Sequence, residues 1–433
     1  MEQRVATARG GSAQRIRRMN AQLVLGHMWC SEPMTASALI EATGLTRATV
    51  LALCRELTEH GWLKVLQNAR EAGAYARGRP ALRYAFREDA CLVIGVDAGQ
   101  HRVSASVCDL RGTEIGQAER VLDPRLCDPV RHSGRERRTE ILAVIEAALE
   151  DAEAEASAVG AMVIGVPAPT DAQGQSPLGV NAFWDSMNPE LASLGEHWGV
   201  PCIVENDANL AAVGELDVDP QGHDSAFAAL LSGERMGAGI MVEGVLMRQP
   251  RGGAGELGML TMVAGVESDA GLGRWAADAA RQALAAAGHE RWRAPSLRAE
   301  DSSLAGIGVD AVRAEHVFVA AAQGDGLARE IEDLLADRLA RICAVLAGLL
   351  DLDRVIVSGA VAPALRGAAE AARQKLGDYI HAPWLEISVS ELGEKAVRRG
   401  AVSCAVEQVR QRALGGEASV RRPSSPHPEP DPD

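Results

Sequence analysis

A polar and basic cluster within residues 46–55 carries side chains of the kind that read DNA bases. Thr46, Arg47 and Thr49 stand at the start of a predicted helix, and Arg55 follows further along it. Hydroxyl and guanidinium groups at this end of a helix can reach base edges in the major groove, while the helix dipole favours phosphate there. We therefore predict that these four residues contact a double-stranded DNA operator.

Three helices and a hairpin are needed to position these side chains. Thr35 and Thr46 are typical helix caps, and Gly44 is typical of the turn between two helices. Hydrophobic periodicity predicts a loose arm before residue 12, helices at 12–30, 36–43 and 46–60, and strands at 62–66 and 81–86. This order is that of an α+β winged helix-turn-helix domain, which we place at residues 1–88. A small helical bundle with a polar face remains the alternative.

The predicted hairpin, or wing, has two arginines at its tip. Arg77 and Arg79 flank Gly78 and precede Pro80, so the tip is both cationic and rigid. Such a tip suits insertion into a narrow minor groove. We predict that Arg77 and Arg79 also contact DNA.

Charge is divided unevenly along the chain. Residues 1–87 hold 13 Lys+Arg and 6 Asp+Glu, a net charge of +7. The remainder has a net charge of −22, which brings the whole chain to −15. A cationic segment attracts polyanions. DNA would repel the acidic remainder, which we therefore expect to lie away from the phosphates.

Cysteine usage and hydropathy argue against several classes of protein. The eight cysteines form no C-x-x-C pair, so neither a disulfide framework nor a zinc knuckle is indicated. The first residues lack the apolar core of a secretory signal, and no apolar run is long enough to cross a bilayer. We expect a cytoplasmic protein without a membrane partner.

The chain beyond residue 88 alternates apolar strands with Ala-rich helices, which indicates an α/β body. Strands are predicted at 90–97, 102–110, 161–166, 201–204 and 354–357, with a helix at 139–158 and an almost continuous helix at 310–350. We place the body at residues 89–413 and expect residues 414–433, rich in Pro, Ser and Gly, to be a disordered tail. No internal repeat is evident.

Four segments of this body resemble the ROK family of repressors and sugar kinases. They are IGVDAGQHRVSASVCDLRG, VIGVPAP, VENDANLAAVGE and SGERMGAGIMVEGVLMRQPRGGAGELGML. The resemblance runs from about residue 13 to 412 and implies a two-lobed actin/hexokinase-like (ASKHA, ribonuclease H-like) α/β body. The winged helix-turn-helix and its Gly-Arg-Pro wing resemble the repressor branch, since kinase members lack that domain.

Both phosphate loops depart from the pattern of the kinase members. Residues 97–101 read Asp-Ala-Gly-Gln-His in place of Asp-x-Gly-Gly-Thr, and residues 233–237 read Gly-Glu-Arg-Met-Gly in place of Gly-Thr-Gly-x-Gly. Glu234 would put a negative charge where nucleotide phosphates bind, and two unit charges at about 4 Å cost roughly 4 kcal/mol at an effective dielectric near 20. We therefore predict no ATP cofactor and no catalytic residue.

Four residues match sugar-site positions of the family. The resemblance makes Asp207 the counterpart of the general base, with Asn206 and Asn181 as sugar-hydroxyl contacts and Glu256 as part of the Gly-Glu-x-Gly motif. Carboxylates and amides pair well with hydroxyls because they supply acceptors and donors. Without intact phosphate loops, we interpret Asp207 as a ligand contact. A helix-capping role for Asp207 is the alternative.

The zinc site that the resemblance implies is not kept. Family members join a His to three Cys of a C-x-C-G-x-x-G-C run, but here Met259 stands at the His position and the run aligns with 267–274, Glu-Ser-Asp-Ala-Gly-Leu-Gly-Arg. Tetrahedral zinc needs sulfur and nitrogen ligands, so we predict no metal. One hypothesis is that an Asp269–Arg274 ion pair takes its place.

Three functions are consistent with these features. The favoured one is a regulator, a repressor in type, that responds to a sugar or sugar derivative as a homodimer or homotetramer. The second is an ATP-dependent sugar kinase with a DNA-binding head. The third is a DNA-binding protein whose body has lost its ligand and serves assembly alone.

Overall fold

A computed structural model describes most of the chain. The described residues are 2–66, 82–127, 134–219, 225–248, 250–285 and 301–415. The predicted wing contacts Arg77 and Arg79 lie outside these ranges, as does nearly all of the tail predicted at 414–433.

The N-terminal head, from α1 to β3, is a helix-turn-helix unit with a small sheet. Its elements are α1 (Glu2–Cys30), β1 (Met34–Thr35), α2 (Ala36–Thr43), α3 (Arg47–Glu59), β2 (Leu63–Leu66) and β3 (Arg83–Phe86). The three strands pair antiparallel in the order β1-β3-β2. Thr35 and Thr46 cap α2 and α3 as predicted, and Gly44 takes the left-handed conformation between them. The prediction for α1 was wrong in one respect, because the helix begins at Glu2 and not near residue 12.

The body, from β4 to α12, consists of two lobes built on the same sheet topology. Lobe I holds β4 (Leu92–Ala98), β5 (Arg102–Cys108), β6 (Glu114–Val121), β7 (Val159–Val166) and β8 (Cys202–Asn206); lobe II holds β9 (Ala226–Ser232), β10 (Met236–Val242), β11 (Val245–Leu246), β12 (Arg354–Ser358) and β13 (Glu386–Val389). The strand orders are β6-β5-β4-β7-β8 and β11-β10-β9-β12-β13. In each sheet the first three strands are antiparallel and the last two are parallel to the first. The two lobes therefore repeat one topology, although the sequence showed no repeat.

Helices cover both sheets. They are α4 (Arg135–Asp151), α5 (Ala182–Met187), α6 (Leu194–Trp198), α7 (Asp207–Val218), α8 (Leu272–Ala285), α9 (Ala314–Ala322), α10 (Gly326–Leu350), α11 (Arg366–Lys375) and α12 (Ala396–Gly415). The predicted helix at 310–350 is broken, because Gly324 has a φ of 96° and Asp325 caps a new helix. Within the described ranges, no single helix is long and apolar enough to cross a membrane; α2 and α3 pass that test only as a pair, bent by 113°.

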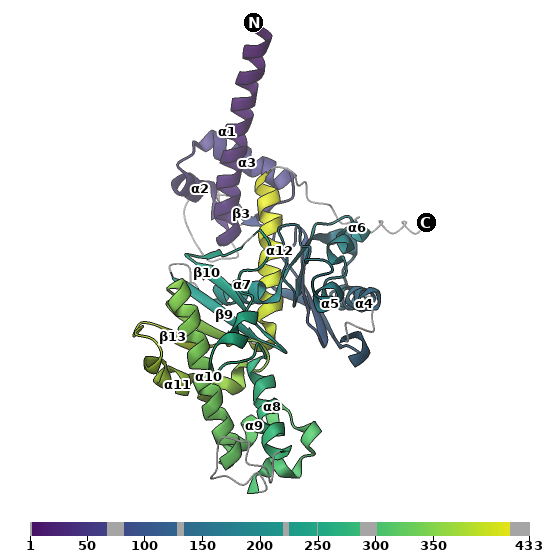
Figure 1. Ribbon diagram of the computed structural model, residues 1–433. Helices are drawn as coiled ribbons and strands as arrows, with labels where there is room; N and C mark the ends of the chain where they lie inside the picture. The colour runs from purple at the N-terminus through teal and green to yellow at the C-terminus, as the bar shows by residue number, and fades with distance from the viewer. Residues whose placement is uncertain are drawn as a thin grey trace.

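Two helices, α7 and α12, fill the space between the lobes (Figure 1). They cross closely at a pair of glycines. A Cβ atom at Gly400 of α12 would overlap the carbonyl of Leu210, and one at Gly214 of α7 would overlap the carbonyl of Ala396. Glycine is required at this crossing because any side chain would push the helices apart.

The head and the body share one hydrophobic core. Trp29 of α1 stacks 4.4 Å from Phe86 of β3, and both belong to a buried cluster that includes Val402 and Val409 of α12. Arg111, in the turn after β5, lies over the Phe86 ring and donates a 3.1 Å hydrogen bond to the carbonyl oxygen of Ser31. The head is thus packed against α12 and lobe I (Figure 1). Because α1 packs against α12, a displacement of α12 would also move α1.

Candidate ligand-binding cleft and DNA-binding face

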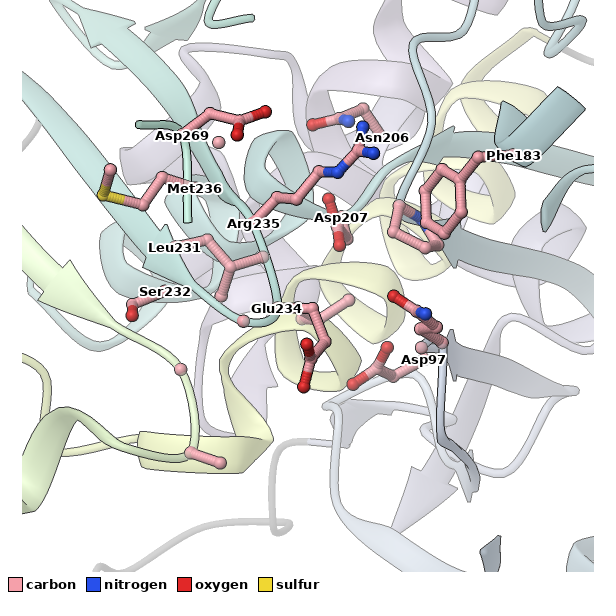
Figure 2. Close-up of a pocket in the computed structure, with 18 of the residues that line it drawn as sticks. Asp97, Phe183, Asn206, Asp207, Leu231, Ser232, Glu234, Arg235, Met236 and Asp269 are labelled. Carbon is pink, nitrogen blue, oxygen red and sulfur yellow. The ribbon is translucent and has the colours of Figure 1, made fainter. Parts of the chain in front are cut away.

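A cleft between the lobes brings together the four residues predicted to contact a sugar. The cavity has a volume of about 410 Å³, and its lining includes Asn181, Asn206, Asp207 and Glu256 (Figure 2). Asp97, at the end of β4, joins them. Parallel strands end at the same edge of a sheet, which is why β4 and β8 deliver polar residues to one place.

Asp207 is the first residue of α7 and the most perturbed carboxyl group of the cleft. Burial, together with the charges of Asp97 and Glu256, raises the pKa of Asp207 to about 8. Burial also raises the pKa of Asp97, to about 6. Asp207 is therefore largely protonated at neutral pH and can donate a hydrogen bond to a bound oxygen atom.

The capping role considered for Asp207 belongs to its neighbour. The Asn206 side-chain oxygen accepts a 3.2 Å hydrogen bond from the Asn209 amide and so caps α7, while the Asn206 side-chain nitrogen donates to the Ala168 carbonyl. The Asp207 carboxylate accepts a 2.8 Å hydrogen bond from the adjacent Ala208 amide. Asn181 in turn caps α5, accepting a 2.9 Å bond from Phe183. The two asparagines are held rigidly at the rim.

The two phosphate loops are equivalent hairpin turns, and a contact between His101 and Glu234 links them across the cleft. His101 lies between β4 and β5, and Glu234 lies between β9 and β10; His101 Nε2 is 3.6 Å from Glu234 Oε1. Arg274 of α8 binds the other Glu234 oxygen at 2.6 Å. The hydrogen bonds from His101 and Arg274 lower the pKa of Glu234 to about 2. A fully ionised carboxylate therefore lies in the second phosphate loop.

The segment aligned with the family's zinc ligands is organised by a buried arginine. The Arg338 guanidinium, on α10, donates hydrogen bonds to the main-chain carbonyls of Val266, Ser268 and Ala270. The hypothesis of an Asp269–Arg274 ion pair was wrong, because Arg274 pairs with Glu234 and Asp278. In the described part of the chain, no group of three or more His, Cys, Asp or Glu side chains is placed to hold a metal ion.

Two residues of the cleft were not singled out from the sequence. Arg235, in the second phosphate loop, lies over the Phe183 ring at 5.0 Å from its centroid, so lobe II contacts lobe I there. The signal available for Arg235 was its position, because it replaces a glycine of the kinase pattern. The sequence carries no such signal for Phe183, because its place in the cleft depends on its contact with Arg235.

The predicted DNA contacts on α3 share one end of the head. Arg47 and Arg55 are exposed and have no carboxylate partner among the described residues, whereas the hydroxyl oxygens of Thr46 and Thr49 lie 2.9 Å apart at the helix start. Val50, Leu53 and Leu57 are buried and pack this helix into the head. Ala48 is exposed beside Arg47.

Family comparison agrees with the arrangement of head and two lobes. Residues 93–408 match the ROK family. The chain belongs to the ROK family. Residues 30–66 also match the IclR helix-turn-helix domain. The computed structure resembles that of a ROK family transcriptional regulator, a homolog of the E. coli MLC protein, with a TM-score of 0.68 at 19% identity, covering 92% of this chain and 98% of that one. This likeness establishes the fold, a two-lobed body with an N-terminal head.

Relatives of this ROK chain include kinases and a repressor. A glucokinase from Streptomyces coelicolor is 30% identical over 73% of this chain and 98% of its own length. The bifunctional enzyme NanE/NanK of Brucella melitensis is 33% identical over 49% of this chain and 39% of its own length. The xylose repressor of Bacillus subtilis is 24% identical over 57% of this chain and 61% of its own length. The chain thus spans less than two thirds of the last two relatives.

Proposed function

We propose that this ROK protein is a sequence-specific DNA-binding transcription regulator, a repressor in type, whose body binds a sugar-like ligand without phosphorylating it. The helix-turn-helix match, the exposed Arg47 and Arg55, and the similarity to a xylose repressor support the first part. The polar cleft around Asp207 supports the second. We place this activity in the cytoplasm, and assign DNA contact to Arg77 and Arg79 as well.

The observation that carries the proposal is the path of α12. Val397 in its first turn lines the cleft, as do Gly393 and Glu394 in the 3-10 turn just before it, whereas Val409 near its end is buried with the core of the head. Arg102 of lobe I binds Glu394 at 2.7 Å. One helix therefore contacts both the ligand cavity and the DNA-binding unit (Figure 1).

This path gives a physical mechanism for regulation. A ligand that binds one state of lobe closure more tightly than the other increases the population of that state. The size of the shift is set by the difference between its affinities for the two states. A change in lobe closure displaces α12, and α12 displaces α1. In a homodimer or homotetramer, two heads must match half-sites about 34–36 Å apart, so a shift of a few ångström at α1 lowers operator affinity.

The cleft also bears on the kinase alternative. The pair between His101 and Glu234 connects the two phosphate loops, and Arg274 completes it. A nucleotide would have to displace both partners and then face an ionised carboxylate. Asp207, although placed as the family's base, would have no phosphoryl donor to act with. The Streptomyces relative keeps the alternative worth testing.

Selection of bound genomic fragments by the purified full chain, followed by binding titrations on the selected duplexes, tests the proposal. We expect specific duplex binding that a sugar or sugar derivative weakens. A chain that ignores duplex DNA at low ionic strength would overturn the regulator function. Robust ATP-dependent phosphorylation of a hexose, abolished in Asp207→Asn, would favour the kinase. Duplex binding that no tested sugar changes would favour the third function, in which the body serves assembly alone.

A further inference from the structure

Arg235 is a cation in the cleft without an ionic partner. It is exposed to the cavity and, within the described part of the chain, none of its N–H groups meets a hydrogen-bond acceptor and no carboxylate lies within ion-pair distance. The Arg235 guanidinium lies over the Phe183 ring, 5.0 Å from its centroid. Figure 2 shows the side chain extending into the pocket among Phe183, Asn206 and Asp207.

The neighbours of Arg235 hold it in position without neutralising it. A guanidinium over an aromatic face is attracted by the ring and keeps its in-plane donors available. Glu256 and Asp269 also line the cavity, and Arg235 offsets part of the rise that burial causes in the pKa of Glu256, yet neither forms an ion pair with it. Asp207, largely protonated at neutral pH, adds a donor and little charge.

This arrangement constrains what the closed cleft can hold. Closure around a neutral sugar would remove water from Arg235 and leave its donors facing hydroxyl groups alone, and an unmatched buried cation is costly. A planar carboxylate, or a phosphate, accepts two parallel hydrogen bonds from the same fork of donors. Arg235 stands where the kinase pattern has glycine, so this cation is a feature of this chain.

We propose that the ligand of the cleft is an anionic sugar derivative, whose carboxylate or phosphate is bound by Arg235 while its hydroxyls meet Asn181 and Asp207. The inference rests on the proposed ligand-responsive function and names its ligand class. Since Arg235 comes from lobe II and Phe183 from lobe I, an oxyanion held at this contact also favours one lobe closure over the other.

Titration calorimetry on the full chain tests the proposal with D-glucuronate, D-glucose 6-phosphate and D-glucose at one ionic strength. Acetate and inorganic phosphate serve as anions without a sugar. We expect one of the two acidic sugars to bind at least tenfold more tightly than glucose and than either simple anion. The acidic sugar that binds identifies which oxyanion the site takes.

Arg235→Met should abolish this preference and bring the acidic sugar to the affinity of glucose, whereas Arg235→Lys should keep part of it. Arg125→Met is the matched control, because Arg125 is 79% exposed on lobe I and absent from the cleft lining. Equal binding of glucose and both acidic sugars, or a preference that survives in Arg235→Met, would overturn the inference and leave a neutral-sugar regulator standing. Silence toward all three sugars, with duplex binding intact, would overturn the inference together with the ligand-responsive part of the function.

Discussion

The Arg338 guanidinium donates a 2.7 Å hydrogen bond to the main-chain carbonyl oxygen of Ser268, 70 residues earlier in the chain. Val266 and Ala270 offer their carbonyls to the same group, and Trp275 lies under it. Arg338 is 1% exposed, and burial lowers its pKa to about 10, so it remains charged. A buried cation thus ties α10 to the segment that aligns with the family's zinc ligands.

Replacement of Arg338 should be among the most damaging single changes in lobe II. In Arg338→Met the apolar stem is kept but three carbonyls lose their donor, which we expect to cost about 2–4 kcal/mol. Urea unfolding measures this loss. Arg341→Met is the control, because Arg341 lies on the same helix, is partly exposed and pairs with Asp337, so its loss should stay below about 1 kcal/mol. Similar losses in the two variants would contradict the ordering role of Arg338.

The raised pKa of Asp207 makes stability depend on pH in a defined direction. The folded chain keeps the Asp207 proton up to about pH 8, whereas the unfolded chain loses it near pH 4. Stability therefore falls as the pH rises through this window. Asp207→Asn has no such proton to lose, so its melting temperature relative to the parent should climb by about 2–6 °C between pH 5 and pH 8.5. Parallel melting curves over that range would show that Asp207 is not desolvated.

We expect Glu234 to exclude nucleotides from the cleft. We expect ATP to leave the melting temperature of the parent chain unchanged, because the carboxylate repels its phosphates. Glu234→Thr restores the kinase residue, leaves Arg274 paired with Asp278 alone, and should raise ATP affinity by about tenfold or more. Glu243→Gln, an exposed substitution in the β10–β11 turn outside the cleft lining, should have no effect. Tight ATP binding by the parent would contradict this account.

Arg47 separates base recognition from simple attraction to phosphate. If Arg47 reads a base, Arg47→Ala should cost about 1–3 kcal/mol on the specific operator and little on random duplex. If Arg47 touches only phosphate, the loss should be uniform across sequences and the salt slope should fall by about 1. Titrations at several salt concentrations distinguish the two. Arg17→Ala is a useful comparison, since Arg17 is already engaged by Glu56 at 2.6 Å. No loss on either duplex would remove Arg47 from the DNA-binding face.

Local features of the chain were predictable because they depend on neighbouring residues. Thr35, Gly44 and Thr46 set the limits of α2 and α3 through hydrogen bonds and backbone angles within a few residues. Apolar runs predicted β4, β7 and β12, which are inner strands of the two sheets. The motifs that resemble ROK proteins predicted four sugar contacts, and all four residues line one cleft.

Tertiary structure alone decided how distant segments meet. The matching topologies of the two lobes arise from strand pairing, which dissimilar apolar sequences satisfy equally well. The contact of Arg235 with Phe183, the pair of His101 with Glu234, and the bonds of Arg338 each join residues at least 50 positions apart. Periodicity and capping report on a few neighbouring residues, so the sequence determined the parts of this chain and long-range packing determined how its cleft and its head are connected.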